Sequence, residues 1–480
     1  MAKGSLRAVA ATVAAVLATA TQATAQASPT ALGCHPGWPV WAYRSGVGGM
    51  VPARVAGLPA GCGITTGYAT SETTLAVTNS GTILFSPANT ENSLARSTDG
   101  GRTWSLTQPS AMQYTSLWNT VDPQVMVDRR TGRVFWAHAT YTEDLRWPLP
   151  DQSPAAWLVP TAVANAHGFQ VYSSADAGRT WRTADYRDEN TADWEKLFAG
   201  PPPQARTGAP QPSGYPDIVY LCANAPVEVS GPGRVCYKSL DGGATFTSTG
   251  LEFPSAVAPV GCPALAANTG VVRPDGTIFI PQSCLNGTYL AASSDEGTSY
   301  HWLRIPGAPP ASGLGAIAQL ATDPAGDLYL LWLAADRLEL AVSRDGGEHW
   351  NAPLAISPPS LHSIALPALA AGPHGEVGVI YYASASASPS ELSGYISQTT
   401  GALAPHPLFY VATVNDPAHP IFDNYGDAYS PRADFVGAAY DADGTFWGAL
   451  VKQLGPPDSA NRIPTTGYLA RLTSRATQTR

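Results

Sequence analysis

The stretch STDGGRTW, residues 97–104, has four related copies further along the chain, and this repeat decides the fold. All five copies share the frame Ser-x-Asp-x-Gly-x-x-aromatic. The Asp side chain can bond backbone N–H groups of a tight turn, and the Ser hydroxyl can close a second local bond. The Gly adopts a positive φ, and the aromatic anchors the returning strand. Each copy therefore predicts a β-hairpin turn. The other copies are SADAGRTW, SLDGGATF, SSDEGTSY and SRDGGEHW, starting at Ser174, Ser239, Ser293 and Ser343.

These copies resemble Asp boxes, the repeat of sialidases and of many other β-propellers. In that family the box lies on the turn between the third and fourth strands of a blade, at the rim and away from the central site. The resemblance implies an all-β propeller, but by itself it does not imply sialidase chemistry. The box aspartates are therefore expected to be structural. They are Asp99, Asp176, Asp241, Asp295 and Asp345.

Hairpin units outside the boxes give the number of blades. Upstream of each box lies an apolar strand, a turn and a second apolar strand, and two further units, starting at Ala368 and Phe435, lack a box. Seven units predict seven blades, whereas six, the number in sialidase catalytic domains, stays open if one unit is an extra strand pair. The last unit ends in GYLARLTS, residues 467–474, without a fourth strand. We expect the segment around Val40 to Arg44 to supply it, because ring closure removes exposed strand edges.

The N-terminus has the features of a secretory signal peptide. Lys3 and Arg7 precede a short apolar run, and Ala23-Thr24-Ala25 offers a cleavage site. The run is too short to span a bilayer. The sequence thus predicts a signal peptide over 1–25, an N-terminal segment with a disulfide over 26–70, and the propeller over 71–480. We expect the mature protein to be secreted.

All six cysteines follow the predicted cleavage site. An even number of cysteines in an exported protein favours disulfides over metal sites. The simplest of the possible sets pairs sequence neighbours, and two of its pairs flank apparent hairpins. The predicted disulfides are Cys34–Cys62, Cys222–Cys236 and Cys262–Cys284.

The charge and hydropathy of the chain exclude some partners. The formal net charge is −9 over 480 residues, and there is no basic run. Nucleic acid and anionic membrane surfaces are therefore poor partners. No later segment is long and apolar enough for a transmembrane helix. We expect a monomer whose partner, by the resemblance, is a glycan or glycoconjugate.

Four acidic residues occupy matching positions at the starts of inner strands, which converge in a propeller. They are Glu72, Asp122, Asp193 and Asp434. One interpretation is a catalytic cluster, because close carboxylates raise one pKa and form an acid/base pair. The same acids could instead hold Ca²⁺, although no cofactor is expected to be required. The alternative is structural: each acid caps its own strand or bonds a neighbouring blade.

A second group of polar residues lies in DNYGDAYSPRAD, residues 423–434. This stretch resembles the Gly-Asp-Tyr segment that opens the last blade in many secreted sialidase-like propellers. Aromatic rings stack on sugars and carboxylates bond their hydroxyls, so we expect Tyr425, Asp427, Tyr429 and Arg432 to bind substrate. The alternative is a hydrogen-bonded loop that locks ring closure.

The sialidase resemblance can be checked residue by residue. That family uses an arginine triad for the substrate carboxylate, an Asp acid/base and a Tyr nucleophile activated by Glu, and a Phe/Tyr-Arg-Ile-Pro motif precedes its first box. Here Leu303-Arg304-Ile305-Pro306 follows the fourth box, and Arg462-Ile463-Pro464 comes later still. Only Arg432 can be placed beside an inner-strand start. The sequence predicts a sialidase-like glycoside hydrolase acting on extracellular glycans, with a non-catalytic carbohydrate- or protein-binding scaffold as the alternative.

Overall fold

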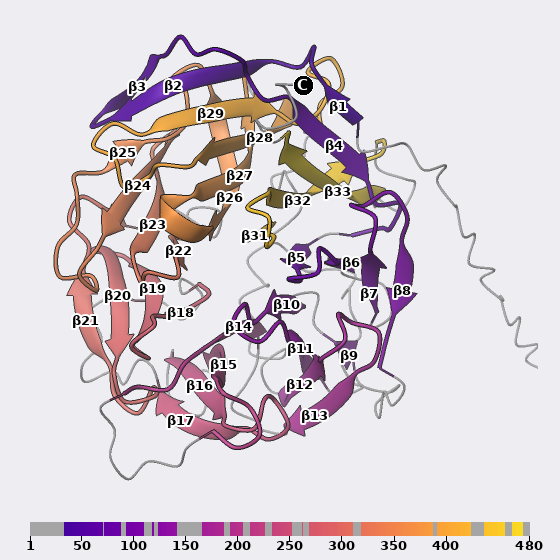
Figure 1. Cartoon of the computed structure of the whole chain (residues 1–480), viewed down its shortest axis with the longest axis vertical. Coiled ribbons are helices and arrows are strands. Elements are labelled where there is room, and N and C mark those ends of the chain that lie inside the picture. Colours follow the sequence, from indigo (N-terminus) through magenta and orange to yellow (C-terminus); the bar gives the residue numbers. More distant parts are fainter. Residues whose placement is uncertain are drawn as a thin grey trace, which may run out of the picture.

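Seven antiparallel sheets form a ring in the computed structural model, so the chain is a seven-bladed β-propeller, as predicted (Figure 1). The described part includes no α-helix and the short 3₁₀ turn η4 (Pro373–Gly375). No helix in it is long and apolar enough to cross a membrane. The structure describes residues 33–70, 72–87, 93–109, 118–119, 123–141, 166–186, 193–204, 212–225, 233–251, 262, 268–310, 318–386, 391–423, 436–456 and 463–473.

The innermost strand of each blade contacts the innermost strand of the next, and the seventh contacts the first, which closes the ring. These strands, in blade order, are β5 (Thr73–Val77), β10 (Gln124–Val127), β14 (Asp193–Gly200), β18 (Val271–Val272), β22 (Gln319–Thr322), β26 (His362–Ala371) and β31 (Gly437–Tyr440).

The remaining strands follow outward in each blade. Blade 1 has β6 (Ile83–Pro87), β7 (Leu94–Ser97) and β8 (Ser105–Thr107), and blade 2 has β11 (Val134–Tyr141), β12 (Ala166–Ser174) and β13 (Arg182–Tyr186), with β9 (Trp118–Asn119) on β11. Blade 3 has β15 (Ile218–Ala225), β16 (Gly233–Ser239) and β17 (Thr247–Leu251), and blade 4 has β19 (Ile278–Cys284), β20 (Gly287–Ser293) and β21 (His301–Arg304). Blade 5 has β23 (Leu328–Ala334), β24 (Arg337–Ser343) and β25 (Leu354–Ala355). Blade 6 has β27 (Val377–Ser384), β28 (Glu391–Thr399) and β29 (Leu408–Thr413), with β30 (Phe422–Asp423) on β28, and blade 7 has β32 (Phe446–Gln453) and β33 (Thr465–Leu472).

An N-terminal strand completes the last blade, but it is not the one that the sequence suggested. The fourth strand of blade 7 is β4 (Gly61–Thr65), which pairs with β33, and β1 (Gly33–His35) pairs with β4. The expected segment, Val40 to Arg44, lies instead in β2 (Val40–Gly46) against β29 of blade 6. The prediction was wrong because β4 has glycine at positions 61 and 63, and glycine is more typical of turns than of strands. A Cβ on Gly63 would overlap the Val414 carbonyl oxygen and the Tyr468 hydroxyl, so close packing requires glycine there.

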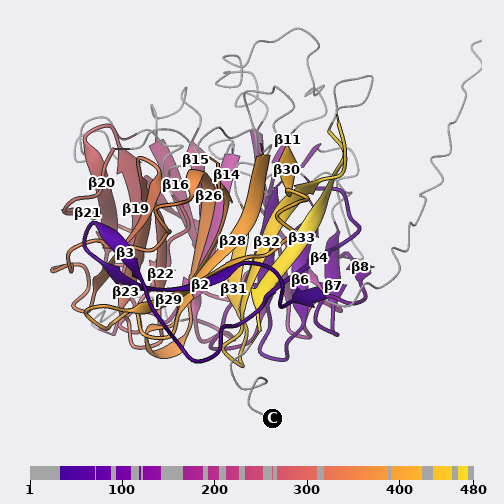
Figure 2. The same ribbon diagram turned by 90° about the horizontal axis from the view of Figure 1, so that it is seen from above.

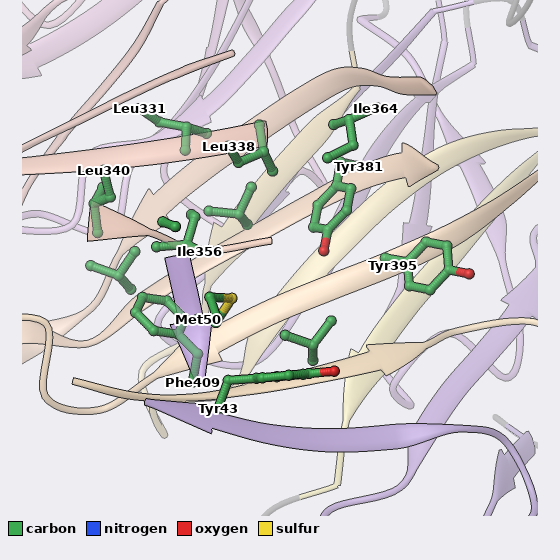
Figure 3. Packing of buried hydrophobic residues seen from close by; sticks show 14 of the residues in the cluster. Tyr43, Met50, Leu331, Leu338, Leu340, Ile356, Ile364, Tyr381, Tyr395 and Phe409 are labelled. Atoms are coloured by element: carbon green, nitrogen blue, oxygen red, sulfur yellow. The ribbon is translucent and has the colours of Figure 1, made fainter. Parts of the chain in front are cut away.

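The N-terminal segment is built into the ring over three blades. After β2 the chain turns into β3 (Gly49–Pro52), and this hairpin packs Tyr43 and Met50 into a buried cluster with Phe409 of blade 6 and Ile356, which follows the last strand of blade 5 (Figure 3). The Ser45 hydroxyl donates to a carbonyl oxygen of β25 at 2.5 Å. Residues 33–65 therefore join blades 5, 6 and 7 on the outside of the ring.

All three predicted disulfides are present. Cys34–Cys62 joins β1 to β4 and so fixes the closing strand, and Cys222–Cys236 joins the paired strands β15 and β16. Cys262–Cys284 ties the end of β19 to the chain before blade 4.

The repeated turns have the bonding that their sequence predicts. In the second copy, Ser174 Oγ donates to Asp176 Oδ1 at 2.8 Å and accepts from the Gly178 N–H. Asp176 also accepts from the Thr180 N–H at 2.8 Å and the Thr180 hydroxyl at 2.7 Å. Burial opposes ionisation, but these hydrogen bonds outweigh it and hold the pKa of the Asp176 carboxyl at about 2. The box aspartate is a structural residue.

Cationic side chains of one blade bond the box of the next. Arg96 of blade 1 donates to a carbonyl oxygen in the second box, Arg133 of blade 2 donates to the third, and Lys238 of blade 3 contacts Glu296 of the fourth at 2.5 Å. The boxes therefore also join blades. Because the strands of each blade alternate in direction, the boxes, which follow the third strands, lie on one face of the ring, here called the box face. The inner strands start at the opposite, inner-start face; Figure 2 shows the ring from the side.

Candidate functional site

Two of the acids predicted at the inner-strand starts lie in the described chain. Glu72 directly precedes β5, its side chain is buried, and its carbonyl oxygen accepts a hydrogen bond from the Thr70 hydroxyl at 3.0 Å. Asp193 is the first residue of β14, where its backbone pairs with Asn224 of β15. Whether these carboxylates form a cluster stays a prediction, because the other predicted site residues lie outside the described residues. These are Asp122, Tyr425, Asp427, Tyr429, Arg432 and Asp434.

The start of β14 is strained. The register slips between Asp193 and Lys196, so this strand carries an extra residue relative to β15. Within the bulge Trp194 has a φ of 60°, the left-handed region that a bulky residue avoids. Such a conformation costs on the order of 1–2 kcal/mol and persists only where surrounding packing imposes it. Strain of this kind at an inner-strand start motivates a functional hypothesis.

Three charged side chains are buried beside this bulge. Glu195 and Arg234 have no exposed surface, and Lys196 is 2% exposed. The Lys196 ammonium lies 4.2 Å from the centre of the Trp194 ring, a cation–π contact, and Arg234 Nη2 donates to the Cys222 carbonyl oxygen at 3.2 Å. Burying charge is costly, so three ionisable groups in one place are unusual for a purely apolar blade interface.

Lys196 and Arg234 lie on the face of blade 3 that packs against blade 4. Lys196 is the register partner of Cys222, and the Cys222–Cys236 pair belongs to the buried cluster shared with Ile278 and Ile280 of blade 4. The disulfide therefore joins β16, from which Arg234 extends, to β15, the strand that pairs with β14 at Lys196. A carboxylate, two cations and an indole are together at the inner-start face.

Sequence reasoning missed Glu195, Lys196 and Arg234. In the stretch ADWEKL, only Asp193 was predicted to be a site residue. The available signal was the pair Glu195-Lys196 inside a strand that is otherwise buried and apolar from Leu197 onward.

A second inner strand is also irregular at its start. The register of β26 slips twice between His362 and Ala368, and both Ser363 and Leu366 have positive φ values, 50° and 47°. His362 Nδ1 lies 3.7 Å from an Asp336 carboxylate oxygen of blade 5. With 10 and 8 residues, β26 and β14 are longer than the other described inner strands, which have 2 to 5. Among the inner strands that the structure describes, a register slip with positive φ values is found in β14 of blade 3 and β26 of blade 6.

A buried histidine near the inner-start face is held neutral. The Gln170 side-chain oxygen accepts from the Tyr172 hydroxyl at 2.6 Å and lies 3.2 Å from His138 Nε2, so this nitrogen carries the proton. Burial lowers the pKa of His138 to about 4, against a smaller opposing effect of the hydrogen bond to Gln170. His138 therefore holds blade 2 together and does not exchange protons near neutral pH.

Of the two arginine motifs that resemble the family's, the first begins on an outermost strand rather than an inner one, and Arg462 of the second lies outside the described residues. Arg304 is the last residue of β21, the outermost strand of blade 4, and donates to the Asn286 carbonyl oxygen at 3.2 Å. One group in the described chain has side chains close enough for a metal ion, Asp345, Glu348 and His349, and it is exposed on the fifth box. This group lies on the box face and contains none of the predicted acids, and the Ca²⁺ interpretation of those acids remains a prediction.

Comparison with known protein families identifies one of the repeated turns. The family model of the BNR/Asp-box repeat matches residues 95–106, which contain the first box. The chain is an Asp-box β-propeller. No curated protein matches the sequence of this propeller.

Solved structures with similar folds have low identity to the Asp-box propeller. The NanB sialidase of Streptococcus pneumoniae is 12% identical with a TM-score of 0.41, over 84% of this chain and 68% of that one. Virginiamycin B lyase of Staphylococcus aureus is 10% identical, TM-score 0.44, over 86% and 99%. The Aleuria aurantia lectin is 13% identical, TM-score 0.40, over 73% and 96%. These likenesses carry no conclusion about activity.

Proposed function

We propose that this Asp-box propeller is an exported protein that acts on extracellular glycans at its inner-start face, as a glycoside hydrolase of sialidase-like type. The observation that carries the proposal is the start of β14, where a strained Trp194 adjoins buried Glu195, Lys196 and Arg234. Three disulfides support export, because such bonds form in oxidising compartments.

The chemistry needs two carboxyl groups, one to protonate the leaving group and one to act as base or nucleophile. The proposed candidates are Glu72, Asp122, Asp193 and Asp434, to which the structure adds Glu195 as a buried carboxyl at the same face. Tyr425, Asp427, Tyr429 and Arg432 are proposed to bind the sugar.

A screen of the purified protein against fluorogenic glycosides and a glycan array tests the proposal. The variants are Glu72→Gln, Asp122→Asn, Asp193→Asn, Asp434→Asn and Glu195→Gln, each checked for native circular dichroism. Loss of an acid/base residue should lower turnover roughly 100-fold or more. Asp275→Asn, on the box face, is the matched control and should keep full turnover. EDTA and added Ca²⁺ test the metal interpretation of the acids.

The second candidate is a non-catalytic carbohydrate- or protein-binding propeller. It is favoured by the burial of Glu72, which would tie strand starts together as a structural acid does. Binding on the array without turnover of any glycoside would support it. Loss of that binding in Trp194→Ala would place the binding surface at β14. Turnover unaffected by all five carboxyl variants would overturn the hydrolase site.

A further inference from the structure

A buried carboxyl group joins blades 2 and 3 on the box face. Asp217, directly before β15, has no exposed surface. Its two oxygens face the Arg130 guanidinium of blade 2, with Arg130 Nε at 3.0 Å and Arg130 Nη2 at 2.6 Å. Arg130 is half exposed, so solvent weakens this ion pair from the blade 2 side.

A second carboxyl group lies beside the first. Asp128, in the turn between β10 and β11, accepts hydrogen bonds from the Tyr215 hydroxyl and from the Thr131 hydroxyl, the latter at 2.9 Å. Tyr215 belongs to blade 3, two residues before Asp217. The Arg133 guanidinium stacks on the Tyr215 ring at 4.5 Å and donates to a carbonyl oxygen of the third box.

The charged and titratable groups that meet here come from two blades. Blade 2 contributes Asp128, Arg130 and Arg133, and blade 3 contributes Tyr215 and Asp217. Burial raises the pKa of Tyr215, and the hydrogen bond to Asp128 raises it further. The Tyr215 hydroxyl therefore keeps its proton and remains a donor. The contact between blades 2 and 3 therefore contains two carboxyl groups, those of Asp128 and Asp217, and one guanidinium, that of Arg130, which bonds Asp217 directly.

We propose that these five residues form a proton-operated latch between blades 2 and 3, which is tight when the two carboxyl groups share a proton and looser when both are ionised. The latch lies on the box face, so it is separate from the proposed glycan site. It gives an exported protein a structural response to acidity.

The direction of the response follows from Asp217. Burial, the charge of Asp128 and a hydrogen bond between the two carboxyls raise the pKa of Asp217 to about 6, against the opposing effect of Arg130. An ordinary Asp titrates near ~3.9. The folded state therefore holds this proton more tightly than the unfolded state. The stabilisation is complete below about pH 4 and is lost as the pH rises through 6.

Thermal unfolding between pH 4.5 and 7.5 tests the latch in wild type and in Asp217→Asn. The amide copies the protonated carboxyl, can still bond Arg130 and can donate to Asp128. On raising the pH, the wild-type midpoint should fall by a few degrees relative to the variant. Hydrogen exchange should show the loss of protection in peptides covering 123–133 and 212–225, and not in blades 5 and 6.

Two further variants keep the proposal falsifiable. Asp128→Asn removes the neighbouring negative charge, so its unfolding midpoint should fall less than that of wild type as the pH rises from 4.5 to 7.5. This comparison is made with wild type, so it does not depend on the folding of Asp217→Asn. Asp275→Asn alters a half-exposed acid in the equivalent turn of blade 4 and should keep the wild-type slope. Parallel pH profiles for wild type, Asp217→Asn and Asp128→Asn would overturn the latch.

Discussion

The Arg96 guanidinium of blade 1 donates a hydrogen bond to the Ala177 carbonyl oxygen, in the box of blade 2, over 2.8 Å. Ala177 is held there at a φ of 58°. At the same place in three other boxes stand Gly100, Gly242 and Gly346, all with positive φ. In these boxes the residue directly before the glycine common to all five copies therefore adopts a left-handed backbone conformation.

Replacing Ala177 by Gly should stabilise the protein. Relief of the left-handed Ala gains about 1–2 kcal/mol, and the greater freedom of Gly in the unfolded chain takes back roughly 0.5–1 kcal/mol. We expect a net gain of about 0.5–1 kcal/mol in urea unfolding. The reverse change, Gly100→Ala, should destabilise by a similar amount. A stabilising Gly100→Ala would contradict this account of the turn.

Ring closure should depend on glycine at position 63. In Gly63→Ala the new Cβ meets a carbonyl oxygen of Val414, which cannot move without disturbing blade 6. We expect a loss of roughly 2–3 kcal/mol, measured by denaturant unfolding. Gly37→Ala is the matched control, because a Cβ there meets nothing within 4 Å and stability should stay within about 0.5 kcal/mol of wild type. Equal effects of the two changes would show that β4 does not close the ring.

Acid should weaken the boxes. Hydrogen bonds, against the effect of burial, lower the pKa of Asp176 to about 2, so its contribution is present above about pH 4 and is lost as the pH falls toward 2. Asp176→Asn should therefore cost stability at pH 6, roughly 1 kcal/mol given its solvent exposure, and less at pH 2. A cost that stays constant from pH 6 to pH 2 would argue against a charged box.

The Cys222–Cys236 disulfide should stabilise blade 3. It closes a loop of 14 residues in sequence, so the Cys222→Ser/Cys236→Ser double variant should lose about 3 kcal/mol. Because the bond joins β16, which carries Arg234, to β15, which pairs with β14 at Lys196, the variant should also lose glycan binding if β14 forms the site. Unchanged unfolding in the double variant would mean that the bond adds nothing to the native fold.

The candidate site was predictable only in part. The position of the inner-strand starts follows from the repeat, so the sequence could place Glu72 and Asp193 at the starts of β5 and β14, while their role stays a prediction. It could not single out Glu195, Lys196 and Arg234. Their proximity depends on a bulge in β14 and on the pairing of β15 with β16, neither of which leaves a periodic signal.

The sequence by itself determined the all-β class, the seven blades, the box turns and all three disulfides. These features are local: each box is bonded within eight residues, and each disulfide joins cysteines adjacent in sequence order. Only the tertiary structure decided which N-terminal strand closes blade 7 and that Tyr215 meets Asp128 across two blades. Both features depend on close packing between segments that are far apart in the chain. A Cβ at position 63 or the loss of the Asp128 carboxyl would disturb that packing, and neither contact leaves a local pattern in the sequence.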